Sequence, residues 1–70
     1  MKTASKRNNS IVQYNCIGEW VVVAKNVDVH YCKEICNFLR TLHPQFKYEY
    51  FKNEYITANK DNLNILLCDF

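Results

Sequence analysis

Hydrophobic side chains alternate with polar ones or cluster in short runs along the first part of the sequence, a pattern typical of β-strands. Residues 10–17 (SIVQYNCI) are rich in β-branched and aromatic side chains, and residues 20–26 (WVVVAKN) give the strongest strand signal in the chain. Gly18 and the residue after it lie between these runs. Because glycine suits the first central position of a type II′ turn, we predict a β-hairpin with Ile17 and Trp20 as the flanking pair. One long strand with a bulge at Gly18 is the alternative.

The spacing of apolar residues becomes helical between Asp28 and His43. Two neighbouring rows of one helix face hold the apolar side chains, which are Val29, Cys32, Cys36 and Leu39 in one row and Tyr31, Ile35, Phe38 and Leu42 in the other. Asp28 suits the N-cap position, and Pro44 ends the helix because the residue before proline avoids helical dihedral angles. We therefore predict one amphipathic helix with a wide apolar face.

The remaining segments give weaker signals. Residues 46–52 alternate, with Phe46, Tyr48 and Tyr50 on one side, so we predict a half-buried strand. Residues 55–58 (YITA) follow a plausible turn and are interpreted as a short strand. Residues 63–70 fit either a helix or a strand; we favour a strand because asparagine is a poor helix former and the segment is short.

These elements predict the α+β fold class. We expect a small antiparallel sheet of three to five strands with one amphipathic helix packed on one face, in the order β-β-α-β followed by β-β or β-α. A strand–helix–strand crossover makes its two strands parallel. If the third predicted strand pairs beside the first, the sheet is antiparallel and the first strand lies between the second and the third. Residues 1–9 lack apolar periodicity and are expected to form a disordered basic tail, followed by one domain at 10–70.

Charge is distributed unevenly over the 70 residues, whose net charge is +2. Lys2, Lys6 and Arg7 supply three positive charges, whereas the chain from residue 8 onward has six bases and seven acids. The predicted domain is thus close to neutral, which argues against a broad nucleic-acid-binding face. The abundance of Asn, Lys, Ile and Tyr suggests an AT-rich genome, and small phage or mobile-element accessory proteins are common in such genomes.

Four cysteines and two histidines raise the question of a metal or redox site. On the predicted helix, Cys32 and Cys36 share the apolar face, while His30 points away from them and His43 is too distant for all of them to reach one ion. We therefore predict no metal site, and we interpret Cys32 and Cys36 as core residues because buried free cysteine behaves as a small hydrophobe. A disulfide between Cys16 and Cys68 is the one pairing that we keep open.

Several function classes lack their sequence signals. The chain has one glycine, which excludes most phosphate-binding loops and dinucleotide-binding motifs, and no serine triad or convincing carboxylate pair is present. We predict a non-enzyme without a cofactor. No run of 18 apolar residues occurs and no apolar segment follows the basic start, so we expect a cytoplasmic protein without a membrane segment or secretory signal.

Two binding functions remain. Strand 20–26 is apolar on both faces, and a single helix covers only one, so the preferred hypothesis is a non-enzymatic protein-binding module that docks on a host factor or self-associates. The expected interface lies on the sheet face opposite the helix and contains Val21, Val23 and Tyr14, whereas Trp20 and Val22 are expected to face the helix. The inverted assignment stays open because both sets are apolar, and the C-terminal segment folding over the interface face is the alternative. The second hypothesis is an RNA- or DNA-binding protein that uses the basic tail and sheet aromatics, with contacts from Lys2, Lys6, Arg7, Lys47, Lys52, Tyr48 and Tyr50.

Overall fold

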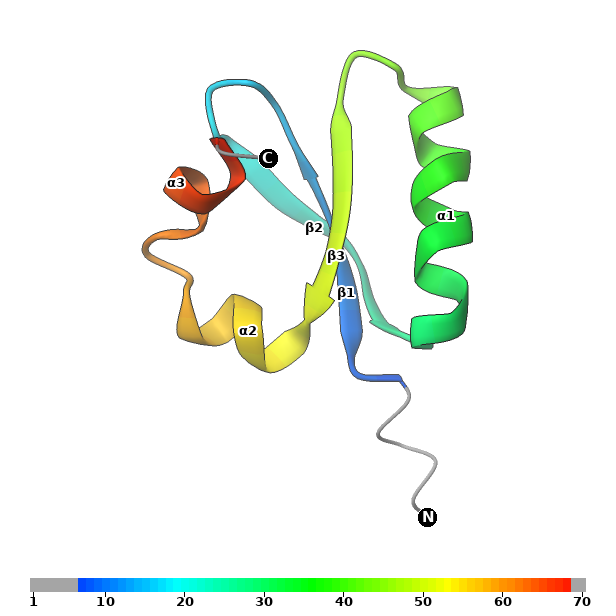
Figure 1. Cartoon of the computed structure of the whole chain (residues 1–70), viewed down its shortest axis with the longest axis horizontal. Helices are drawn as coiled ribbons and strands as arrows, with labels where there is room; N and C mark the ends of the chain where they lie inside the picture. The colour runs from blue at the N-terminus through cyan, green and yellow to red at the C-terminus, as the bar shows by residue number, and fades with distance from the viewer. Residues whose placement is uncertain (1–6, 69–70) are drawn as a thin grey trace.

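The computed structural model describes residues 7–68, which form one three-stranded sheet between two layers of helix (Figure 1). The elements in chain order are β1 (Asn9–Tyr14), β2 (Trp20–Val27), α1 (Val29–Leu42), β3 (Lys47–Lys52), α2 (Asn53–Ala58) and α3 (Leu63–Cys68). Both strand pairs are antiparallel and the strand order is β2-β1-β3. The predicted α+β class, the small antiparallel sheet and the central place of the first strand are confirmed.

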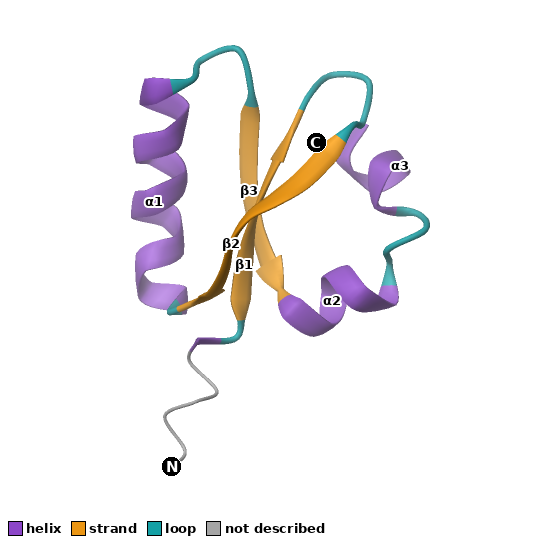
Figure 2. Cartoon of the chain, turned by 180° about the vertical axis from the view of Figure 1, so that it is seen from behind, coloured by secondary structure: helices purple, strands orange, loops and turns teal. Residues whose placement is uncertain are grey.

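The sheet has a hydrophobic cluster on each face, and each cluster is closed by a different layer of helix. On one face Ile11, Cys36 and Tyr48 are buried, and Ala24, Val27, Ile35, Leu39 and Phe46 pack around them. On the other face Val12, Tyr14, Leu63 and Leu67 are buried, with Trp20, Val22, Phe51, Ile56 and Leu66 around them. Figure 2 shows α1 on one side of the sheet and α2 with α3 on the other. The C-terminal segment therefore covers the second sheet face, which was the alternative arrangement.

The prediction that Trp20 and Val22 face the long helix is wrong. These residues lie opposite Tyr14 and Val12 in the register of β1 and β2, and all four belong to the cluster covered by the C-terminal helices. Since side chains alternate along a strand, Val21 lies on the α1 face instead. Both residue sets are apolar, so composition alone left the two orientations equivalent.

Strand β2 contains two irregularities that change its twist and direction. Val12 pairs with Val22 but Ile11 pairs with Ala24, so Val23 is an extra residue in β2. A second shift follows before Val27, where Asn26 adopts a positive φ of 55°. Such bulges bend a strand and increase its twist, and β2 crosses the sheet obliquely in Figure 2.

The hairpin between β1 and β2 is confirmed, but its predicted two-residue turn is wrong. The strands close at the pair Tyr14 and Trp20, and a loop of intervening residues joins them. The Asn15 side chain organises this loop, because its Oδ1 accepts main-chain N–H bonds from Ile17 (3.1 Å) and Glu19 (3.0 Å). Gly18 has a φ of 87°, the left-handed conformation that glycine tolerates best.

The long helix begins and ends where the sequence predicts. Asp28 Oδ1 accepts the main-chain N–H of His30 at 2.9 Å, which is an N-cap interaction. At the other end the main-chain N–H of His43 donates to the Leu39 carbonyl at 2.8 Å, directly before Pro44. The capping prediction for Asp28 is therefore confirmed.

The two strands predicted after residue 54 are wrong, because both segments are short helices. Helix α2 continues directly from β3 and places Tyr55 against Phe51, with stacked rings whose centroids are 5.2 Å apart. In α3, Leu63 and Leu67 are one helical turn apart and both are buried against the sheet. This contact with the apolar second face outweighs the poor helix propensity of the asparagines.

The N-terminal boundary lies close to the expected one. Residues 1–6 of the predicted tail lie outside the described part of the chain, and Asn9 already belongs to β1, where it pairs with Lys52. Among residues 7–68, no helix has the length and apolar character needed to cross a bilayer.

Candidate protein-binding surface

One flank of α1 and strand β2 both carry exposed apolar side chains. They include five side chains that are between 43% and 63% exposed, namely Val21, Val23, Tyr31, Phe38 and Leu42. We refer to these five residues as the lateral patch. None of them carries a charge.

The helix geometry places this flank of α1 on the β2 side. Arg40 lies on the opposite flank, roughly 160–200° around the helix axis from Tyr31, Phe38 and Leu42 at 100° per residue. The Arg40 guanidinium reaches β3, where Nη2 donates to the Tyr48 carbonyl at 2.6 Å. Since β2 is the strand at the other edge of the sheet, the apolar flank is directed toward the β2 side, where Val21 lies on the same sheet face as α1.

A hollow in the protein surface lies next to Val21 of the lateral patch. Its volume is about 250 Å³, and its lining includes Val21 from β2, Gln13 from β1 and Phe46 from the segment after α1. Gln13 is held there by the Tyr48 hydroxyl, which donates to Gln13 Oε1 at 2.9 Å. The surface therefore combines apolar side chains with a fixed concave edge.

The size of the lateral patch is within the range of functional surfaces. Its side chains expose on the order of 500 Å² together, and the largest apolar patch of a typical monomer is roughly 300–600 Å² and often functional. A stable protein interface buries about 800 Å² on each partner. The lateral patch with a polar rim would supply such an interface.

The residues predicted for the interface are placed differently from one another. Val21 and Val23 are 51% and 43% exposed and belong to the lateral patch. Tyr14 is only 4% exposed and packs in the cluster beneath α3, so its side chain has no surface to offer to a partner.

Sequence reasoning missed the contribution of α1 to this surface. Tyr31, Phe38 and Leu42 belong to the second apolar row of the helix, and none of them was predicted as an interface residue. Only Cys32 and Cys36 of α1 are buried, because a helix lying on a sheet buries one narrow stripe. The width of the apolar face could have indicated this surface. A helix needs one apolar row to pack on a sheet, so the second apolar row of α1 is available for another contact.

The residues predicted to contact nucleic acid are dispersed. Lys2 and Lys6 lie outside the described residues, whereas Arg7, Lys47 and Lys52 are exposed. Tyr48 is 1% exposed and its hydroxyl is bonded to Gln13, so it presents no ring face for a base. Tyr50 is 37% exposed. Of the aromatic residues of β3, Tyr48 belongs to the core beneath α1, whereas Phe51 packs in the cluster on the other sheet face.

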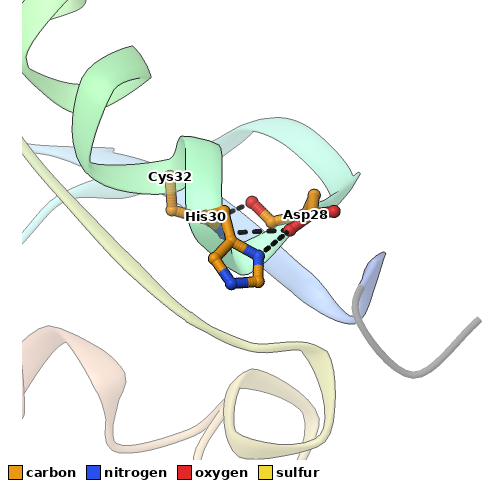
Figure 3. A network of polar contacts seen from close by, with 3 residues as sticks. All are labelled: Asp28, His30 and Cys32. Atoms are coloured by element: carbon orange, nitrogen blue, oxygen red, sulfur yellow. Dashed lines mark hydrogen bonds and ion pairs between the residues drawn. The ribbon is translucent and has the colours of Figure 1, made fainter. Parts of the chain in front are cut away.

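The helix cysteines are held in their protonated form. Figure 3 shows Cys32 at the start of α1, where its Sγ donates to the Asp28 carbonyl at 3.5 Å, while the His30 ring lies 2.9 Å from Asp28 Oδ1. Burial raises the pKa of the Cys32 thiol, with a further contribution from Asp28. Burial also raises the pKa of Cys36 to about 11, against the lowering effect of Arg40. Thiolates are the reactive form, so neither cysteine is prepared for nucleophilic chemistry.

The other two cysteines differ from this pair. Cys16 in the hairpin loop and Cys68 at the end of α3 are free and exposed. Within residues 7–68, no three Cys, His, Asp or Glu side chains come together as a group that could hold a metal ion.

Comparisons with known proteins identify no relative. No protein-family model matches the chain, and neither the curated proteins nor the solved structures contain a significant match to it. The surface of this chain is therefore the guide to its function.

Proposed function

We propose that the protein is a small non-enzymatic protein-binding module that acts through the lateral patch, by pairing with a second copy or by docking on another protein. The observation that carries the proposal is the exposure of Tyr31, Phe38 and Leu42 next to Val21 and Val23. Solvent contact of this much apolar area is unfavourable by about 25 cal/mol per Å², and a partner would remove it.

A second copy of the chain is the partner that we favour. A twofold dimer brings the same patch of both copies together, so charges at its centre would repel their own copies. The five residues of the lateral patch are uncharged, and the exposed Glu34 lies beside Tyr31 and Phe38 on the same flank of α1. A 70-residue chain also buries a small share of its surface and gains more from association than a large domain does.

The proposal includes a cytoplasmic location and a role as a phage or mobile-element accessory protein. Four free cysteines suit a reducing compartment. The AT-rich codon preference implied by the composition supports the genomic context.

Nuclear magnetic resonance during dilution tests this function. We expect the amide and methyl signals of the lateral patch to shift as the concentration falls, while those of α2 and α3 stay constant. Signals that are independent of concentration throughout, with no change when proteins of the source cell are added, would contradict the proposal.

Nucleic-acid binding is the alternative, and salt separates the two functions. Contacts between lysine or arginine and phosphates weaken steeply as salt rises, whereas burial of the lateral patch does not. Exposed Arg7, Lys47 and Lys52 are the described basic residues that the alternative would use.

A further inference from the structure

A second concave site lies on the opposite side of the sheet from α1, between β2 and α2. It is a cleft of about 420 Å³ lined by Ser10, Trp20, Val22, Lys25, Asn53, Ile56, Thr57 and Lys60. Clefts that bind small ligands measure roughly 300–1,000 Å³. We call it the β2–α2 cleft.

The floor of the β2–α2 cleft is apolar and rigidly supported. Trp20, Val22 and Ile56 are all half-buried and pack against the core cluster of Val12 and Leu63. Because the Trp20 side chain is already fixed by packing, a planar ring of a ligand can stack on it with little loss of side-chain entropy. The floor therefore suits a flat, uncharged part of a ligand.

The rim of the same cleft is positive. Lys25 comes from β2 and Lys60 follows α2, and neither forms an ion pair with another residue of 7–68. No acidic residue lines the cleft. Two ammonium groups of this kind attract an anion.

The other polar groups at the rim are already engaged. The Ser10 hydroxyl donates to Asn53 Oδ1, and the Asn53 amide donates to Asn26 Oδ1 at 3.0 Å. Thr57 donates to the Asn53 carbonyl at 3.1 Å. These bonds fix the wall between β1, β2 and α2, and they leave the two lysines as the rim groups available to a ligand.

From these features we infer that the β2–α2 cleft binds a small ligand that combines a planar ring with a phosphate or carboxylate group. The ring would lie on the Trp20 floor and the anion would bind between Lys25 and Lys60. This site is independent of the lateral patch, which lies on the α1 side of the sheet.

Fluorescence of Trp20, the single tryptophan of the chain, tests this inference. We would titrate the whole protein with adenosine monophosphate and with 2-naphthoate, which carry a ring with a phosphate and a ring with a carboxylate. Adenosine lacks the anion and inorganic phosphate lacks the ring. We expect saturable quenching by at least one of the two complete ligands, at least tenfold tighter than by adenosine or phosphate.

Matched lysine variants locate the site. The double variant Lys25→Gln/Lys60→Gln should weaken binding at least tenfold, whereas Lys33→Gln/Lys47→Gln, which changes two exposed lysines outside the cleft, should leave it unchanged. Absence of saturable binding by both complete ligands would overturn the inference, as would equal losses in the two double variants. Phe38→Asp, which alters only the lateral patch, should bind the ligand normally, so the two proposals can fail separately.

Discussion

Arg40 on α1 donates a hydrogen bond of 2.6 Å to the main-chain carbonyl of Tyr48 on β3. This bond fixes the rotation of α1 about its axis, because it holds one flank of the helix at the β3 edge. The apolar flank with Phe38 is then directed toward β2. The same bond occupies a carbonyl of an edge strand, which would otherwise be available for pairing with another strand.

Removing the guanidinium should therefore loosen α1. Arg40→Met keeps the aliphatic stem but loses the bond to Tyr48, and we expect the free energy of unfolding to fall by about 1–2 kcal/mol. Urea denaturation measures this change. Glu49→Gln is the control, since it removes only the 3.6 Å ion pair with Arg40, whose side chains are substantially exposed. That loss should stay below about 0.5 kcal/mol, and an equal loss in both variants would contradict the role of the carbonyl bond.

The covering of the second sheet face by α3 can be tested with two neighbouring residues. Leu67 is 1% exposed, whereas Ile65 is 61% exposed on the same helix. Leu67→Ala should cost about 2–4 kcal/mol of stability, while Ile65→Ala should change it by less than about 0.5 kcal/mol. Similar melting temperatures for the two variants would show that α3 does not close this face.

Gly18 is required where the hairpin loop meets α3. A Cβ at this position would lie 2.7 Å from the Asn64 carbonyl oxygen and 3.0 Å from Cys68 Sγ, and its φ is 87°. We expect Gly18→Ala to lower stability by about 2 kcal/mol and to shift the amide signals of α3. Adding Cys68→Ala should restore only part of the loss, because the main-chain contact remains. Full restoration would mean that the sulfur contact alone is responsible.

Stability should decrease at alkaline pH. The Cys36 thiol has an ordinary pKa of 9.0 and a folded pKa of about 11, mainly because of burial. Between these values the unfolded chain has released a proton that the folded chain retains, so the free energy of unfolding falls as pH rises. Burial also raises the pKa of Cys32 and of Tyr14, which adds an effect of the same sign.

Denaturation on either side of this pH interval measures the effect. The Cys36→Ala variant serves as the reference, because it lacks the thiol and should lose less stability over the same interval. An identical pH dependence in both proteins would show that Cys36 is not the titrating group.

The sequence predicts local features better than it predicts the orientation of faces. The caps of α1 were predictable because Asp28 and Pro44 act on their immediate neighbours. The face of β2 that meets α1 was not, because Val21 and Val22 are chemically alike and the bulge at Val23 changes the alternation. The C-terminal helices depend on contact of Leu63 and Leu67 with a distant sheet face, which local propensity does not contain.

The candidate surface was likewise predictable only in part from the sequence. Val21 and Val23 were predicted for the interface because a strand that is apolar on both faces needs cover on both. The structure covers both sheet faces with helices and still leaves these two side chains about half-exposed. Tyr31, Phe38 and Leu42 were not predicted for the interface, since spacing alone does not tell which apolar row of a helix meets the sheet.

The central claim is that the lateral patch makes a protein contact, and sedimentation velocity over a wide concentration range tests it most directly. We expect the wild-type chain to associate as its concentration rises, and Phe38→Asp to remain a folded monomer. Asn37→Asp places the same charge on an exposed neighbouring position outside the patch and should associate like the wild type. Leu39→Asp should unfold the chain, because Leu39 packs against the core cluster. A wild-type chain that stays monomeric at every concentration, or equal association of Phe38→Asp and Asn37→Asp, would contradict the account.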